Sequence, residues 1–189
     1  MTNVVTILGS PRTNSDSSRL ADALAASLTG GAGASARHVL NGLKHARGCQ
    51  ACQSCKGKTD SCVVKDDLAP VLGTAAAADV VIIASPVYIG EITAQLKLFV
   101  DRTYSWFLPD FHTNPSPGRL PKGKKLVLIF TQGNPDAGTY TRVFEAYKGY
   151  FAHQGFKAEY RCVTVPVGPD HDKAVEAAEA EIKKLADTL

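Results

Sequence analysis

The chain alternates short apolar runs of strand length with longer segments whose apolar residues recur every three or four positions. The runs at Val4–Leu8, Asp79–Ser85 and Lys125–Thr131 are almost continuously apolar, which is typical of parallel strands buried on both faces. Two weaker runs of similar length occupy Ala36–Leu40 and Ala158–Pro166. The pattern therefore predicts five strands.

The segments between these runs have helical periodicity. In Ser15–Leu28, for example, Leu20, Leu24 and Leu28 share one helical face. Helices are also predicted from Asp66 or Asp67 to about Ala77, and over Thr93–Phe107, Tyr140–His153 and Asp172–Thr188. Five strands that alternate with five helices predict an α/β fold with a doubly wound, five-stranded parallel sheet in the order 2-1-3-4-5.

The chain of 189 residues has the length of one domain, and no linker or internal repeat divides it. Residues 41–65 show no clear period and contain four of the five cysteines. We therefore expect one flavodoxin-like domain with a cysteine-rich insert. Because the insert lacks an apolar pattern, much of its order could depend on a bound metal.

Composition excludes several classes of function. A net charge of +3, with no dense run of lysine or arginine, does not indicate nucleic acid as a partner. No segment approaches the roughly 18 apolar residues of a membrane helix, and the residues before Val4 do not form a signal peptide. We therefore expect a cytoplasmic protein without a membrane partner. Thiols stay reduced in the cytoplasm, so clustered cysteines there predict metal or redox chemistry rather than disulfides.

The loop after the first strand has the composition of a phosphate site. It opens a helix, where free amides and the positive end of the helix dipole favour an anion. Hydroxyl groups and one guanidinium could bind the phosphate oxygens, and they belong to Ser10, Arg12, Ser15, Ser17 and Ser18. A helix N-cap is the alternative interpretation, but it would account for Ser15 alone.

The loops after the third and fourth strands are the other candidates, because ligands of doubly wound sheets bind at the carboxyl ends of strands. The third-strand loop contains Pro86, Val87, Tyr88, Ile89 and Gly90. Its tyrosine offers a flat face to a ring system, although a core position would suit it equally well. The fourth-strand loop is a polar turn whose glycine permits close backbone approach, and it contains Thr131, Gln132, Gly133 and Asn134.

Three of these segments resemble the NADPH-dependent FMN reductase superfamily. They are G-S-P-R-x-x-S at 9–15, S-P-V-Y-I-G-E-I-T at 85–93, and the run ending in Phe99-Val-Asp-Arg102. Within the superfamily, the chain is similar to iron–sulfur flavoproteins and to multimeric flavodoxin-like reductases. The resemblance implies FMN, with its phosphate on loop 10–18 and its ring against residues 86–90 and 131–134. It also implies a homodimer or homotetramer.

The four clustered cysteines follow the spacing Cys49-x2-Cys52-x2-Cys55-x6-Cys62. Soft thiolates suit iron–sulfur clusters, and the spacing is similar to the compact motif of iron–sulfur flavoproteins. Three interpretations stay open: a [4Fe–4S] cluster, reduced thiols without metal, and structural zinc, which usually takes two separated C-x2-C pairs. Cys162, in the fifth predicted strand, is expected to be a buried apolar residue.

The predicted function follows from the cofactor, because no triad or paired carboxylates suggest a catalytic side chain. The first hypothesis is an FMN-dependent electron-transfer protein or oxidoreductase that passes electrons between a cysteine-bound cluster and FMN, with a ferredoxin-like donor. The alternative is an NAD(P)H-dependent FMN or quinone reductase without a cluster, with a small molecule or flavin as acceptor. A simple flavodoxin-type carrier fits poorly, because such carriers are small and acidic, whereas this chain has a cysteine-rich insert and a net charge of +3.

The lysines around the cysteines suggest where a protein donor would bind. Lys56, Lys58 and Lys65 flank the cysteine motif, so this surface is expected to be basic and to suit an acidic ferredoxin-like partner. Ordinary solvated loop lysines are the competing interpretation.

Overall fold

The computed structural model describes residues 2–189, and its centre is a parallel sheet of five strands. The strand order is β2-β1-β3-β4-β5, so the predicted doubly wound topology is confirmed. The strands are β1 (Val4–Leu8), β2 (Ala36–Val39), β3 (Val80–Pro86), β4 (Lys125–Gln132) and β5 (Lys157–Thr164).

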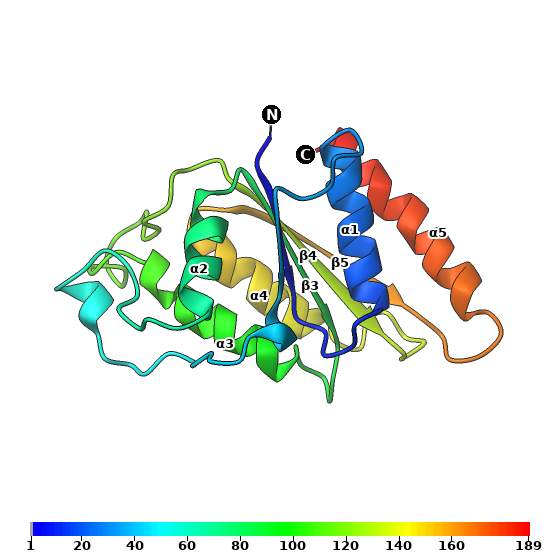
Figure 1. Cartoon of the computed structure of the whole chain (residues 1–189), viewed down its shortest axis with the longest axis horizontal. Helices are drawn as coiled ribbons and strands as arrows, with labels where there is room; N and C mark the ends of the chain where they lie inside the picture. The colour runs from blue at the N-terminus through cyan, green and yellow to red at the C-terminus, as the bar shows by residue number, and fades with distance from the viewer. Residues whose placement is uncertain (1) are drawn as a thin grey trace.

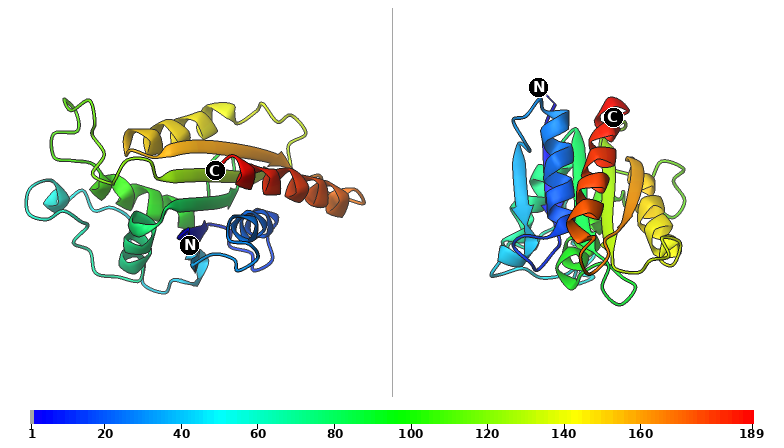
Figure 2. Two further views of the ribbon diagram at one scale, coloured as in Figure 1. Left: turned by 90° about the horizontal axis from the view of Figure 1, so that it is seen from above. Right: turned by 90° about the vertical axis from the view of Figure 1, so that its right-hand side faces the viewer.

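Helices cover both faces of the sheet. They are α1 (Asp16–Leu28), α2 (Leu68–Ala77), α3 (Ala94–Arg102), α4 (Thr141–His153) and α5 (His171–Lys183). Short 3-10 segments are η1 (Leu40–Gly42), η2 (Ser54–Lys56), η3 (Thr103–Trp106) and η4 (Lys184–Asp187). Helices α1 and α5 lie side by side on one face, and α2, α3 and α4 lie on the other (Figures 1 and 2).

Each face of the sheet carries its own hydrophobic core, because successive side chains of a strand point to opposite faces. Val4 and Leu8 of β1 belong to the core under α1 and α5, whereas Val5 and Ile7 belong to the core on the other face. Leu24 of α1 is completely buried in the first core. Truncation of such a leucine to alanine typically lowers the free energy of unfolding by about 2–5 kcal/mol.

Local hydrogen bonds explain where the helices begin and end. The Ser18 amide donates to the Ser15 hydroxyl (3.2 Å), which caps α1. The helix predicted over Thr93–Phe107 is α-helical only to Arg102 and then continues as η3. Thr103 and Ser105 donate their hydroxyls to carbonyl oxygens three residues earlier (2.7 and 3.0 Å), and such bonds favour the tighter 3-10 turn.

Because the strands are parallel, their carboxyl ends meet at one edge, which is the lower edge in Figure 1. The loops after β1, β3, β4 and β5 therefore gather there. None of the helices described within residues 2–189 is long and apolar enough to cross a membrane.

Candidate functional site

A cavity of about 210 Å³ opens at the carboxyl edge of the sheet, and we call it the strand-end pocket. Its wall comes from four loops and the start of two helices. The lining residues are Ser10, Arg12, Ser15, Asp16, Pro86, Val87, Tyr88, Thr131, Gln132, Gly133, Val165, Pro166, Val167 and His171. The fold thus brings together side chains from all three loops singled out in the sequence.

The loop after β1 is held in shape by the protein itself. A Cβ at Gly9 would lie 2.7 Å from the Cβ of Leu96, so only glycine allows the loop to approach α3 this closely. Thr93 donates its hydroxyl to the carbonyl of Gly9 (2.6 Å), and the Arg12 amide donates to the buried Ser10 hydroxyl (3.2 Å). The Arg12 side chain is exposed at the pocket wall.

The serines of this loop divide into two groups. Ser10 and Ser15 line the pocket, whereas Ser17 and Ser18 are buried and do not. The Ser15 hydroxyl lies 2.8 Å from that of Ser18 and 3.3 Å from that of Ser17. Ser15 is therefore the one serine that caps α1, and it also lines the pocket, whereas the hydroxyls of Ser17 and Ser18 bond to the Ser15 hydroxyl.

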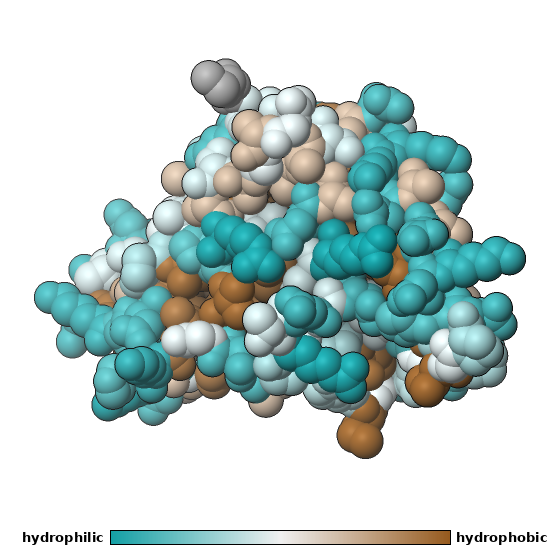
Figure 3. All heavy atoms as spheres, turned by 45° about the vertical axis from the view of Figure 1, so that its right-hand side comes forward, coloured by the Kyte–Doolittle hydropathy of each residue, from teal (hydrophilic) through white to brown (hydrophobic). Residues whose placement is uncertain are grey.

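The loop after β3 forms a tight turn closed by two backbone bonds between Tyr88 and Glu91 (2.8 and 3.1 Å). At its tip, Ile89 has φ of 51° and Gly90 has φ of 76°. A β-branched residue in this left-handed region is strained. The Ile89 side chain is fully exposed. The loop projects beyond the sheet in Figure 1, and a hydrophobic projection stands at the same end in Figure 3. Pro86, Val87 and Tyr88 line the pocket, but Ile89 and Gly90 do not.

The loop after β4 is fixed by Gln132. Its side-chain amide donates to the carbonyls of Asn134 (3.0 Å) and Asp136 (2.9 Å), and its oxygen accepts from the Cys162 thiol (3.1 Å). Cys162 is half-buried rather than fully buried, and this burial raises its pKa to about 11. Thr131, Gln132 and Gly133 reach the pocket, whereas Asn134 does not line it.

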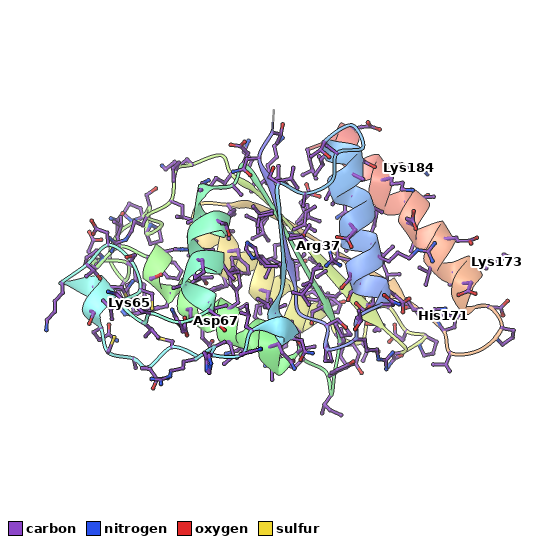
Figure 4. All side chains as sticks on the ribbon, viewed as in Figure 1. Arg37, Lys65, Asp67, His171, Lys173 and Lys184 are labelled. Atoms are coloured by element: carbon purple, nitrogen blue, oxygen red, sulfur yellow. The ribbon has the colours of Figure 1, made fainter. Side chains whose placement is uncertain are left out.

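Five residues of the pocket wall lie outside the set predicted from the sequence: Asp16, Val165, Pro166, Val167 and His171. His171 begins α5 and lies beside the start of α1 (Figure 4), with its Nε2 3.3 Å from the Asp16 carboxylate. Its Nδ1 lies 3.0 Å from the Asp172 carboxylate. Hydrogen bonds to Asp172 and Asp16 raise the pKa of His171. No local signal marked this residue, because only the sheet topology joins positions 16 and 171.

The cysteine loop, residues 43–67, connects η1 to α2. All five cysteines of the chain are free thiols. Cys49, Cys52, Cys55 and Cys62 line one small hollow, together with Arg102 and Tyr104. Within residues 2–189, however, no three histidine, cysteine or acidic side chains converge as a metal site would require. The donor set suits a soft metal, while its side chains are not drawn together.

Cationic side chains anchor this loop to the rest of the protein. Lys56 donates to the carbonyls of Tyr104 and Phe107 (both 2.7 Å) and lies 4.1 Å from the Tyr104 ring centre. Its burial lowers its pKa. Arg119 donates to the Cys55 carbonyl (3.0 Å) and pairs with Asp60. The loop thus has protein contacts that hold it without metal.

The position of Lys56 corrects one expectation. Lys56 does not belong to a solvated basic surface, because its ammonium group is taken up by two carbonyls and an aromatic ring. Lys58 and Lys65 are exposed beside the cysteines, and Figure 4 labels Lys65 at the end of the loop.

A larger cavity of about 660 Å³ adjoins the cysteine hollow, with Cys49, Ala51, Gln53 and Tyr104 in both linings. Helices α3 and α4 form most of its wall. Glu91, from the turn after β3, accepts a hydrogen bond from Tyr147 there (2.9 Å). This cavity shares no lining residue with the strand-end pocket.

Comparisons with known proteins agree with the geometry. The sequence pattern of one family, NADPH-dependent FMN reductase, matches residues 2–143. An iron-sulfur flavoprotein from Archaeoglobus fulgidus is 34% identical over 145 residues, which cover 76% of this chain and 62% of that protein. The match thus spans less than two thirds of that relative.

Solved structures share the fold. An FMN-dependent NADH-azoreductase from Bacillus anthracis, in complex with FMN, superposes with a TM-score of 0.72 at 17% identity and full coverage of this chain and 99% of the other. An NAD(P)H:quinone oxidoreductase from Methanothermobacter marburgensis gives a TM-score of 0.71 at 15% identity, covering 97% of this chain and 93% of the other. At such identities the likeness establishes the fold alone.

Proposed function

This chain belongs to the NADPH-dependent FMN reductase family, and from that premise we propose that it is an FMN-dependent oxidoreductase with FMN in the strand-end pocket. The observation that carries the proposal is the convergence of three separate loops on one cavity at the carboxyl edge of the sheet.

The chain's own groups suit the phosphate end of FMN. The Ser18 and Arg19 amides at the start of α1 already donate to Ser15, but the positive end of the helix dipole favours an anion, and Arg12 adds a positive charge at the same wall. The carboxylate of Asp16 would oppose a phosphate, but His171 lies against it and offsets its charge when protonated. Ser10 and Ser15 supply hydroxyls at the same wall.

The other two loops suit the ring of FMN. Pro86, Val87 and Tyr88 offer apolar and aromatic surface, and Gly133 leaves backbone uncovered. Bound FMN would supply transfer of one or two electrons. The residues of this chain would bind the ring, fix its orientation and limit the access of water to one side of it.

We further propose that Cys49, Cys52, Cys55 and Cys62 bind a [4Fe–4S] cluster, which would supply one-electron chemistry. Two observations support this: the four cysteines line one hollow, and a relative at 34% identity is an iron-sulfur flavoprotein. An acidic ferredoxin-like donor would then meet Lys58 and Lys65. We also expect a homodimer or homotetramer, with two or four times the 20.1 kDa mass of the chain.

One observation favours a second candidate function. The thiols do not converge within the described residues, as they would in a preformed metal site. An NAD(P)H-dependent FMN or quinone reductase without a cluster is therefore the alternative. Its donor would be a nicotinamide and its acceptor a small molecule or a flavin.

Anaerobic expression and reconstitution, followed by flavin, iron and sulfide analysis, separates the two. The cluster proposal predicts FMN together with about four iron and four sulfide per chain, by the stoichiometry of the cluster. Any single Cys→Ser change among Cys49, Cys52, Cys55 and Cys62 should remove most of the iron, whereas Cys162→Ser should not. Iron-free protein that NAD(P)H reduces fully would replace the cluster proposal with the alternative.

A further inference from the structure

Arg102 is a buried cation whose hydrogen bonds all point toward the cysteine loop. It ends α3, and its side chain is completely excluded from solvent. Its Nε donates to the sulfur of Cys62 at 2.9 Å. Its Nη2 donates to the Val64 carbonyl, and its Nη1 to the Arg47 carbonyl and the Asp66 carboxylate, each at 2.9 Å.

These acceptors come from both ends of the loop. Arg47 lies before the first cysteine, and Val64 and Asp66 lie after the last. Asp66 strengthens the junction, because its carboxylate also accepts from the Arg47 amide (2.9 Å) and from the first amides of α2 (3.2 Å). Although its burial opposes ionisation, the hydrogen bonds from Arg102 and Arg47 lower the pKa of Asp66. One guanidinium therefore closes the segment that contains all four clustered cysteines.

The geometry needs an arginine. Four acceptors surround a planar fork, and a lysine has a single nitrogen with which to reach them. Arg119 offers a natural contrast, because it also contacts the loop, at the Cys55 carbonyl and Asp60, but touches no cysteine sulfur.

We propose that Arg102 is a positioning residue for the fourth cysteine ligand: it closes the cysteine loop and holds the sulfur of Cys62 by an N–H···S hydrogen bond before any metal arrives. This inference rests on the proposed cluster. Hydrogen bonds and positive charge at a ligand sulfur favour the reduced state of a cluster. Arg102 should therefore make the midpoint potential less negative than it would be without this contact.

The first part of the test uses iron-free protein and measures amide hydrogen exchange in the wild type, Arg102→Gln, Arg102→Lys and Arg119→Gln. The Arg47 amide donates to the Asp66 carboxylate and the Asp67 amide to the His45 carbonyl, so these two hydrogen bonds join the two ends of the cysteine loop. Both amides should exchange about tenfold faster in both Arg102 variants, the factor expected for one lost charge-assisted hydrogen bond. In Arg119→Gln the faster exchange should be confined to residues 56–60. The amides of α4 serve as the control for global unfolding.

The second part uses reconstituted protein and follows the midpoint potential by EPR. Arg102→Gln should have a more negative potential than the wild type, and the shift should exceed that in Arg119→Gln. If the wild type binds iron but Arg102→Gln has the wild-type exchange rates at the Arg47 and Asp67 amides and the wild-type midpoint potential, the role of Arg102 is overturned and the cluster proposal stands. If the wild type binds no iron, the cluster and the ligand role of Cys62 fall together, while the exchange rates still show whether Arg102 closes the loop.

Discussion

Charged side chains at the strand-end pocket determine how well it suits a phosphate. Arg12 carries a positive charge and His171 gains one when protonated. Asp16, the first residue of α1, carries a negative charge and lies against His171. Because the pocket is open to solvent, each charge acts through partly screened interactions. The balance of these three groups leads to two predictions.

Replacement of Arg12 by alanine should weaken the binding of FMN far more than the binding of riboflavin, which lacks the phosphate. A lost charge-assisted contact costs about 1.5–3 kcal/mol, and exposure of Arg12 favours the lower end, so we expect about a tenfold rise in the FMN dissociation constant. Flavin fluorescence titration measures both ligands. Arg19→Ala is the matched control, because Arg19 pairs with Glu179 and does not line the pocket. Equal losses for FMN and riboflavin would refute the phosphate assignment.

The contribution of His171 to the affinity for FMN should fall as the pH rises from about 6 to 8. The pKa of His171 is raised by its hydrogen bonds to Asp172 and Asp16, so its positive charge, and any stability it adds, is complete below about pH 6.5 and is lost as the pH rises through the raised pKa. A neutral His171 leaves the Asp16 charge uncompensated beside the phosphate.

Titrations of FMN across this range in the wild type and in His171→Gln measure the effect. The variant should show only the dependence that comes from the phosphate itself, whose second pKa is about 6. The binding of riboflavin should show neither the pH dependence from His171 nor the one from the phosphate. The same pH dependence in both proteins would exclude His171 as its source.

At the scale of elements, the turn after β3 stores backbone strain in an exposed position. Ile89→Gly removes an unfavourable left-handed conformation and loses no packing, because the side chain is fully exposed. The variant should have a free energy of unfolding up to about 1 kcal/mol higher, measured by urea denaturation without flavin.

Val167→Gly is the matched control for this prediction. Val167 is equally exposed but is not among the described residues with positive φ, so glycine there should lower the free energy of unfolding by roughly 0.5–1 kcal/mol. A loss of stability in Ile89→Gly as large as that in Val167→Gly would contradict the assigned strain.

Lys56 and Lys58 have similar sequence surroundings but different structural roles. Lys56→Gln removes two hydrogen bonds to carbonyls and a contact with the Tyr104 ring, so the free energy of unfolding should fall by about 1–2 kcal/mol. Lys58→Gln should change it by less than about 0.5 kcal/mol, because Lys58 is exposed. Urea denaturation measures both, and similar values for the two variants would argue against the anchoring role of Lys56.

At the scale of the whole molecule, the sheet was the most predictable part. Strands β1, β3 and β4 are buried on both faces, so their apolar runs were unambiguous, and alternation with helices left few topologies. Loop composition also indicated which strand ends would gather polar groups, since parallel strands end at one edge.

Contacts between distant segments were not predictable. The pairing of His171 with Asp16 and the four bonds of Arg102 depend on how helices and loops dock, and neither leaves a local pattern in the sequence. From the sequence, Lys56 was interpreted as a solvent-exposed lysine, because no neighbouring residue indicated that the Tyr104 and Phe107 carbonyls would accept hydrogen bonds from it. The serines of loop 10–18 indicated an anion site, but no local pattern showed that Ser10 and Ser15 would line the pocket while Ser17 and Ser18 are buried.

The central claim is that the strand-end pocket binds FMN through its phosphate, and the binding of FMN and riboflavin to the unaltered protein tests it most directly. Equilibrium titration by flavin fluorescence at low ionic strength should give one FMN per chain. FMN should bind at least about tenfold more tightly than riboflavin, the factor expected for one charge-assisted phosphate contact. Riboflavin that binds as tightly as FMN, or the absence of saturable FMN binding, would contradict the claim.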